Sequence, residues 1–331
     1  MSRERFLKAC TGRITQKPAI GPGTSIVSRE LMDFLDAKFP RAHLDVSQMC
    51  MLAEAGHTIY GFDVVMPLFS VCHESAAIGC DVDWGNERTM PWVTKALWKH
   101  DREIVIPADF AKTEPAQVPL KAITELKKRL GNDAAVCGKV FGPWTLGYHT
   151  FGIEHWLIST LDDPDLIKRA IQSLKKVTIE FARAQIEAGA DCILIGDHAT
   201  RDLCSPTAYR EFLFELHQEL AGRISVPTIL HICGDTADRL PMIATTGLSC
   251  FHWDTKLGSP EKARKLAGNS IALMGGINNP LVIRTGSTSD IAAQCSNAAS
   301  AGIDILAPEC AVPLDTPMKN LKSIGRYAAV S

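Results

Sequence analysis

The sequence predicts an α/β protein folded as a distorted (β/α)8 TIM-type barrel, and three observations favour that fold. The second half of the chain alternates short apolar runs with helical patterns, which indicates five strands in succession. The first half supplies three further apolar runs, which completes the eight strands of a barrel. An open dinucleotide-binding sheet would carry a G-x-G-x-x-G turn after its first strand, and the sequence contains none.

Short apolar runs bounded by turn residues mark the expected strands. Runs that are apolar throughout, without alternation, are typical of parallel strands buried on both faces. In chain order the runs cover residues 18–21, 59–67, 134–141, 191–196, 227–234, 249–254, 271–276 and 303–308.

Helices should separate the later strands, because serine, proline and glycine stand where helices begin and end. Ser205 with Pro206 predicts a helix start, and Gly222 predicts its end. Ser259 with Pro260 predicts a second start of the same kind. Further helical patterns cover 162–188, 236–245 and 289–301, and a last helix begins at 316–317.

Residues 68–118 are less regular than the rest of the chain. They contain a group of charges at 81–85 and a proline at 107, and they lack a clear strand–helix unit. We therefore expect an insertion at the mouth of the barrel, preceded by an N-terminal extension, within a single domain over residues 1–331.

Composition and charge exclude several classes of partner. The chain has 35 Lys and Arg against 37 Asp and Glu, so no basic excess predicts binding to nucleic acid or to an anionic membrane. No apolar run reaches the roughly 18–20 residues of a membrane span, and the charged N-terminus lacks a signal-peptide core. A cytoplasmic location is expected, with the eleven cysteines as free thiols or metal ligands. An oligomer is compatible with the sequence, which does not predict the number of subunits.

A histidine and two cysteines stand at the carboxyl ends of predicted strands, where barrel enzymes carry their chemistry. His231 and Cys233 are two residues apart on one strand and so share a face, and Cys310 follows another strand across the same mouth. One imidazole and two thiolates suit a Zn²⁺ ion. A buried strand with a satisfied histidine and a small cysteine is the plainer interpretation of the His-x-Cys pair alone.

The spacing of these residues favours a catalytic metal over a structural one. The sequence contains no Cys-x-x-Cys pair, and three distant ligands leave a coordination position for a substrate. Two thiolates make the metal a weaker Lewis acid, which favours binding of a substrate thiol and alkyl transfer to sulfur. Asp254 or Glu309, both at strand ends, is a candidate fourth ligand, and a hydrogen-bonded carboxylate at the rim is the alternative for each.

Seven segments across nearly the whole chain carry recognisable motifs. They are Phe141–Leu146, Cys204–Phe212, His231–Gly234, Leu273–Asn278, Asp304–Cys310, Gly23–Val27 and Asp63–Pro67. Together they resemble the uroporphyrinogen decarboxylase superfamily, and within it the corrinoid-dependent methylcobamide:coenzyme M methyltransferases and the related methyl-halide methyltransferases. The His-x-Cys…Cys set is the specific part of the resemblance.

The resemblance implies a fold, a cofactor and two partners. It implies a distorted eightfold barrel in which His231, Cys233 and Cys310 bind a catalytic zinc that receives an acceptor thiol, usually coenzyme M. It also implies a separate small corrinoid protein that presents its methylated corrinoid, or methylcobalamin in an assay, at the barrel mouth. The expected function is zinc-dependent methyl transfer between the corrinoid and a small thiol. Homocysteine and tetrahydrofolate are alternative acceptors.

Further residues are expected at the rim of the pocket, where they would contact the corrinoid. They are Asp63, which matches an aspartate of the decarboxylases, Tyr148, which follows the Gly-Pro-Trp-Thr motif, and Asp197 at a strand end. His198 and His252 are expected at the rim or behind the metal ligands.

Three other functions stay open. The enzyme could load a methyl group from a methyl halide or methoxy donor onto the corrinoid, or it could act as a decarboxylase. The decarboxylases carry arginines in the segment matching 18–28, where this chain has none, and a histidine where Cys310 stands, so decarboxylation is disfavoured. The non-enzymatic alternative is a corrinoid-docking or tetrapyrrole-binding module with a structural zinc.

Overall fold

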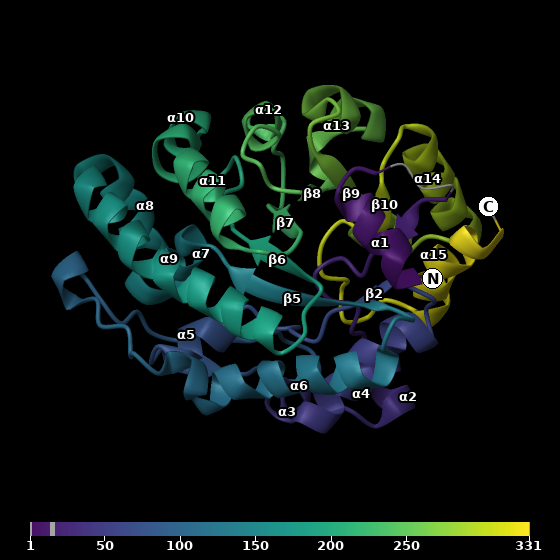
Figure 1. Cartoon of the computed structure of the whole chain (residues 1–331), viewed down its shortest axis with the longest axis horizontal. Helices are drawn as coiled ribbons and strands as arrows, with labels where there is room; N and C mark the ends of the chain where they lie inside the picture. Colours follow the sequence, from purple (N-terminus) through teal and green to yellow (C-terminus); the bar gives the residue numbers. More distant parts are fainter. Residues whose placement is uncertain (1, 14–16, 331) are drawn as a thin grey trace.

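Eight parallel strands form the centre of the molecule (Figure 1). The computed structural model describes residues 2–13 and 17–330. Each strand falls on one of the eight predicted apolar runs, so the predicted barrel is confirmed. The strands are β1 (Ala19–Ile20), β2 (Val64–Val65), β5 (Ala135–Phe141), β6 (Cys192–Gly196), β7 (Thr228–His231), β8 (Cys250–Trp253), β9 (Ala272–Ile277) and β10 (Ile305–Pro308).

The strands pair in the order β1-β10-β9-β8-β7-β6-β5-β2, so β1 and β2 meet at the seam of the barrel. One backbone hydrogen bond crosses the seam, from the N–H of Asp63 to the carbonyl oxygen of Ile20, at 3.0 Å. The carboxylate of Asp63 returns a second bond by accepting from the N–H of Ile20 at 2.9 Å. The seam is the weakest join of the barrel, and a side chain closes it.

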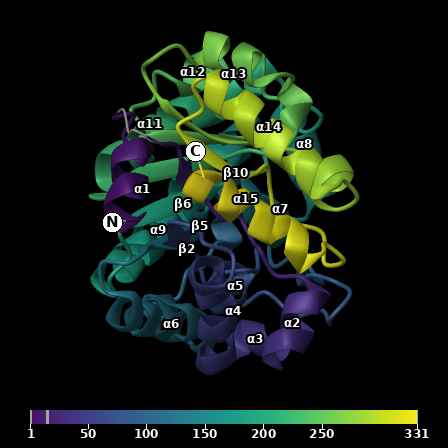
Figure 2. The ribbon, with the colours of Figure 1, turned by 90° about the vertical axis from the view of Figure 1, so that its right-hand side faces the viewer.

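Helices surround the strands on the outside (Figures 1 and 2). Two predicted starts are confirmed: the hydroxyls of Ser205 and Ser259 each accept a bond from the N–H three residues later. No helix in the described ranges is both long and apolar enough to cross a membrane. The α-helices are α1 (Ser2–Cys10), α2 (Arg29–Leu35), α3 (Arg41–Leu44), α4 (Val46–Thr58), α5 (His73–Ala77), α6 (Glu114–Leu130), α7 (Pro143–Phe151), α8 (Ile153–Asp162), α9 (Pro164–Glu187), α10 (Pro206–Ala208), α11 (Phe214–Arg223), α12 (Leu240–Ile243), α13 (Pro260–Ala267), α14 (Thr288–Ser300) and α15 (Met318–Val330).

Short turns of other helix types connect these elements. The 3₁₀ turns are η1 (Asp101–Glu103), η2 (Phe110–Lys112) and η4 (Thr255–Leu257), and the π-turns are η3 (Tyr209–Leu213) and η5 (Asn279–Ile283). The π-turn η3 joins α10 to α11, so the helix predicted from Ser205 to Gly222 is continuous but underwound at one place.

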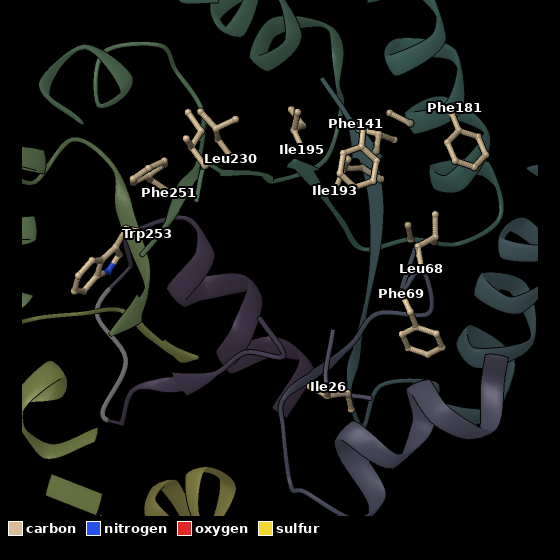
Figure 3. Packing of buried hydrophobic residues seen from close by; sticks show 14 of the residues in the cluster. Ile26, Leu68, Phe69, Phe141, Phe181, Ile193, Ile195, Leu230, Phe251 and Trp253 are labelled. Carbon is tan, nitrogen blue, oxygen red and sulfur yellow. The ribbon is translucent and has the colours of Figure 1, made fainter. Parts of the chain in front are cut away.

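Two separate cores follow from the alternation of side chains along each strand. One set of positions fills the barrel interior with small and sulfur-containing side chains, among them Ala135, Cys137, Cys192 and Ile229. The alternate positions pack outward against the helices and form the larger core; Figure 3 shows some of them, including Ile195, Leu230 and Phe251. Which set a residue belongs to decides whether its side chain can reach the interior of the barrel.

The N-terminal extension covers the amino end of the barrel. Helix α1 contributes Phe6, Ala9 and Cys10 to the interior core and contacts strands β1, β2, β5, β9 and β10. Because α1 occupies this end, a ligand must enter from the carboxyl end.

The irregular stretch 68–118 lies at that carboxyl end, as predicted. It contains α5, the two turns η1 and η2, and a small antiparallel ribbon of β3 (Val82–Asp83) and β4 (Trp92–Val93). Its side chains Phe69, Val71 and Met90 line a cavity at the barrel mouth. The insertion therefore acts as part of the wall around the site.

Candidate active site

The structure brings His231, Cys233 and Cys310 together, although 77 positions separate the two cysteines. The ring nitrogen Nε2 of His231 lies 3.0 Å from Sγ of Cys233, and the two sulfur atoms lie 3.3 Å apart. All three ligand atoms lie within 4.8 Å of one another. Since zinc binds sulfur at about 2.3 Å and imidazole nitrogen at about 2.0–2.1 Å, one ion fits among them.

Each of the three residues is positioned by the end of a strand. His231 is the last residue of β7 and shares the inward face of Ile229. Cys233 lies two residues beyond that strand, and Cys310 lies two residues beyond the end of β10. The parallel arrangement places both strand ends at the same mouth, which is why residues far apart in sequence form one cluster.

The orientation of His231 suits a metal ligand. Its Nδ1 atom lies 3.2 Å from the carbonyl oxygen of His252. A carbonyl can only accept, so Nδ1 carries the proton and Nε2 is left with a free lone pair facing the two sulfur atoms. A hydrogen bond to the far nitrogen of this kind is typical of metal-binding histidines. His252 is itself fixed, because its Nε2 donates to the carbonyl of Pro308 at 2.8 Å.

The two cysteine thiols share one hydrogen bond, and it separates their acidities. The contact between the two sulfur atoms, in which either can donate, holds the pKa of Cys310 well below its ordinary value despite burial. The same bond raises the pKa of Cys233. Cys310 is therefore ready to act as a thiolate toward a cation.

A glycine lets the N-terminal loop approach this cluster closely. Gly23 has φ of +64°, and a Cβ atom there would lie 2.6 Å from the carbonyl oxygen of Cys310. The next residue, Thr24, places its hydroxyl 3.8 Å from the Cys310 sulfur. Only glycine combines this backbone conformation with so close an approach, which explains the glycine in the motif 23–27.

The cluster lies in the wall of a cavity of about 140 Å³ at the barrel mouth. A wider, open groove of about 610 Å³ adjoins it and shares Met90 and Ala311 with its lining. The cavity is lined by Thr24, Phe69, Val71, Met90, Pro91, Lys139, Phe141, Leu194, Gly196, His198, His231, Cys233, Cys310 and Ala311.

Sequence reasoning missed Lys139 as a site residue. It lies in the middle of β5 on the inward face shared with Ala135 and Cys137. A lysine inside an otherwise apolar buried strand was the available signal, because a buried charge needs a partner or a function. His198 was expected at the rim, and the structure places it in the cavity wall.

The two candidate fourth ligands hold other partners. The carboxylate of Asp254 accepts bonds from the backbone N–H groups of Gly234, next to Cys233, and of Lys256, at 2.8 and 2.9 Å. The carboxylate of Glu309 accepts bonds from Thr255, Asn278 and Asn279. Among the residues that the structure describes, neither belongs to the tight group of possible ligand atoms. Asp254 remains the nearer candidate because it borders Cys233.

The structure does not place Asp197 or Tyr148 among the residues that line the cavity, and their expected contact with the corrinoid stays a prediction. Asp197 follows the outward set of β6 positions and is fully buried, where Thr145 and His217 bond its carboxylate. Tyr148 packs behind the cavity wall, and its hydroxyl donates to the carbonyl of His198 at 3.2 Å. Both residues support the loop that carries His198.

Asp63 lies at the opposite end of the barrel from the cluster, which corrects its expected place at a strand's carboxyl end. Strand β2 begins at Val64, so Asp63 precedes it. The guanidinium of Arg5 on α1 donates two bonds to its carboxylate, at 2.9 and 2.5 Å. Its contacts are those of a residue that closes the barrel and fastens α1.

Comparison with known proteins gives relatives over the full length. The chain is 29% identical to the methylcobamide:CoM methyltransferase MtaA of Methanosarcina barkeri, over 97% of this chain and 96% of the relative. It is 29% identical to a methylated-thiol--coenzyme M methyltransferase of Methanosarcina mazei, over 98% of this chain and 88% of that one.

A solved structure is also similar along the whole chain. The methyltransferase from Methanosarcina mazei matches with a TM-score of 0.96 at 29% identity, covering 99% of this chain and 98% of that one. The model of the uroporphyrinogen decarboxylase (URO-D) family matches residues 1–328. The chain therefore belongs to the uroporphyrinogen decarboxylase family.

Proposed function

We propose that the protein is a zinc-dependent methyltransferase that moves a methyl group between a methylated corrinoid, carried on a small partner protein, and a small thiol such as coenzyme M. One observation carries the proposal: an imidazole and two thiols converge in the wall of a cavity at the barrel mouth. The full-length relatives named as methyltransferases support it. A cytoplasmic setting belongs to the proposal, because all eleven cysteines are free.

The three candidate ligands and their neighbours have different roles in binding the metal, orienting the histidine ring and excluding water. A zinc ion bound by His231, Cys233 and Cys310 would take the substrate sulfur as a further ligand and favour its deprotonated form. The carbonyl of His252 keeps the His231 ring in the tautomer that a metal needs. The apolar side chains of Phe69 and Val71 keep water away from the reacting sulfur.

The transfer balances without a further reactant. The substrate thiolate attacks the methyl carbon, a carbon–sulfur bond forms, and the cobalt–carbon bond breaks with its electron pair leaving on the corrinoid. The thiol proton passes to solvent when the sulfur binds. No general base would be required, because a zinc ion held by His231, Cys233 and Cys310 would favour the thiolate form of the substrate.

The cavity disfavours a porphyrinogen substrate. Its volume is about 140 Å³, and a cavity of about 150 Å³ holds a ligand the size of benzene. Lys139 is the only lysine or arginine among the described residues that line it, whereas a substrate with many carboxylates needs several cations. Decarboxylation is therefore the weaker candidate.

The test is turnover of methylcobalamin followed by its visible spectrum. We expect demethylation that requires both a small thiol and zinc, is abolished by a chelator and is restored by added zinc. Uroporphyrinogen should not be converted. Decarboxylation of uroporphyrinogen at ordinary enzyme rates, with methylcobalamin untouched by every thiol tried, would refute the proposal.

X-ray absorption at the zinc edge separates the two directions of transfer. If the protein methylates a thiol, adding coenzyme M places a new sulfur ligand on the zinc. If it loads the corrinoid from a methyl halide or methoxy donor instead, the sulfur count stays unchanged with coenzyme M and with homocysteine. The measurement needs no corrinoid partner.

A further inference from the structure

A buried lysine in the cavity wall has no role in the chemistry described so far. The side chain of Lys139 points into the barrel above Cys137, and only 2% of the residue is exposed. An ammonium group loses its hydration when it is buried this deeply, which is costly without partners. The fold keeps it nevertheless, on the same cavity that holds the cysteine cluster.

The ammonium group is only partly satisfied by the protein. It donates one hydrogen bond, to the carbonyl of Thr24 at 3.3 Å, and lies 5.6 Å from the centre of the Phe141 ring. No carboxylate of the described residues comes within 4.0 Å of its nitrogen. An ammonium has three N–H donors, so two of them have no acceptor among the residues that the structure describes.

The carboxyl group with the largest charge interaction with Lys139 is that of Glu74, which does not come within 4.0 Å of the lysine nitrogen. Glu74 on α5 is buried; one carboxylate oxygen accepts from the N–H of Phe141 at 2.8 Å and the other has no partner. Burial lowers the pKa of Lys139 to about 8, and Glu74 and Cys310 oppose that change. The lysine is therefore mainly protonated at neutral pH, as a cation facing the cavity.

One residue links this cation to the metal ligands. Thr24 accepts the Lys139 bond through its carbonyl and places its hydroxyl 3.8 Å from the Cys310 sulfur. The cation and the sulfur cluster therefore border the same small space, separated by the width of one residue. A compact ligand that binds the cluster through one end brings its other end to the ammonium.

We propose that Lys139 is the specificity-determining residue for the thiol substrate, binding a single acidic group at the far end of a short thiol. The assignment rests on the proposed function, because it assumes that the sulfur binds at the cysteine cluster. A thiol with a sulfonate or carboxylate two carbons away completes the hydrogen bonds of the ammonium. A neutral or cationic thiol leaves the buried charge without a partner.

The experiment compares three thiols that share a two-carbon spacing and differ in charge at the far end. They are 2-mercaptoethanesulfonate, 2-mercaptoethanol and 2-aminoethanethiol, titrated calorimetrically into the zinc-loaded protein. Wild type should bind the sulfonate at least about tenfold more tightly than the alcohol, since hydrogen bonds to charged groups are the strong ones. The amine should bind most weakly.

The decisive measurement is how each substitution changes the affinity for each thiol, because the three thiols differ in intrinsic acidity. Lys139→Met should weaken binding of the sulfonate at least about tenfold, keep the affinity for the alcohol within about twofold and strengthen binding of the amine. Lys139→Arg should keep the preference for the sulfonate. Lys168→Met, at an exposed lysine on α9, is the matched control and should change nothing. Lys139→Gln replaces the methionine variant if that one does not fold.

The outcomes separate this assignment from the proposed function. An equal loss of affinity for all three thiols in Lys139→Met would overturn the assignment of Lys139, because a lysine with only a structural role would affect their binding equally. Equal affinity of wild type for all three would overturn it as well, while the metal–thiol proposal stands. If the zinc-edge spectrum shows that no thiol reaches the metal, the proposed function itself fails and this assignment falls with it.

Discussion

At the scale of single residues, the cluster owes its chemistry to three side chains that no local segment could bring together. His231 and Cys233 come from the end of β7, and Cys310 comes from the end of β10. The protonated Nδ1 of His231 and the low pKa of the Cys310 thiol both prepare lone pairs for a cation. The residues therefore act as one unit, and loss of one ligand should affect all of them.

We expect Cys310→Ala to lose most of about one zinc per chain, because the imidazole and one thiol that remain are too few ligands for tight binding. Elemental analysis of carefully prepared protein measures this directly. Cys295→Ala on α14 is the matched control, since it removes another buried cysteine far from the mouth and should retain the metal. Wild-type protein without zinc would contradict the site.

At the scale of elements, the candidate site lies at the carboxyl ends of the strands, and the contacts that close the barrel lie at their amino ends. Asp63 joins β1 to β2 across the seam and fastens α1 through Arg5. These contacts stabilise the barrel without touching the cavity. Stability and function are therefore divided between the two ends, as is usual for this fold.

We expect Asp63→Asn to lower the free energy of unfolding by about 2 kcal/mol, because it removes the charge of a buried carboxylate from a partly exposed arginine and weakens the seam. Urea unfolding followed by circular dichroism measures the change. Asp315→Asn is the matched control, since Asp315 forms an exposed pair in which two nitrogens of Arg284 donate to its Oδ2 atom, and its loss should cost less than about 1 kcal/mol.

The second readout for Asp63→Asn is zinc content and thiol affinity, which should equal those of wild type. A variant that folds normally and yet loses thiol binding would restore Asp63 to the pocket, where the sequence placed it. Loss of stability with an intact site agrees with its position beside α1.

At the scale of the whole molecule, the barrel does not depend on a metal for its core. The interior and outer clusters of buried side chains extend around all eight strands, whereas the cysteine cluster occupies one place at the mouth. A metal at such a place adds its binding energy to a fold that is already stable. This distinguishes the molecule from small domains that fold only around zinc.

We therefore expect the chelated protein to keep its far-ultraviolet circular dichroism and a cooperative thermal transition. The melting temperature should fall by only a few degrees, as expected when a ligand leaves a folded protein of this size. Loss of helical signal on chelation would favour a structural zinc and a docking module. Re-addition of zinc should restore the original melting temperature.

The apolar runs by themselves predicted the eight strands. The motif His231-x-Cys233, together with Cys310, predicted the side chains of the candidate metal site. Both are properties of short segments: a run that is apolar throughout indicates a strand buried on two faces. The parallel topology then implies that strand ends meet at one mouth.

Only the tertiary structure decided which neighbours of those segments reach the cavity. Side chains alternate between the barrel interior and the helices, so a shift of one residue in the register of a strand exchanges the two sets. For this reason Asp197 packs outward while His198 and Lys139 line the cavity. Asp63 lies at the amino end of the barrel instead of the mouth, because strand β2 begins after it. The inward face of each strand is determined when the sheet closes around a common interior, and no single segment contains that information.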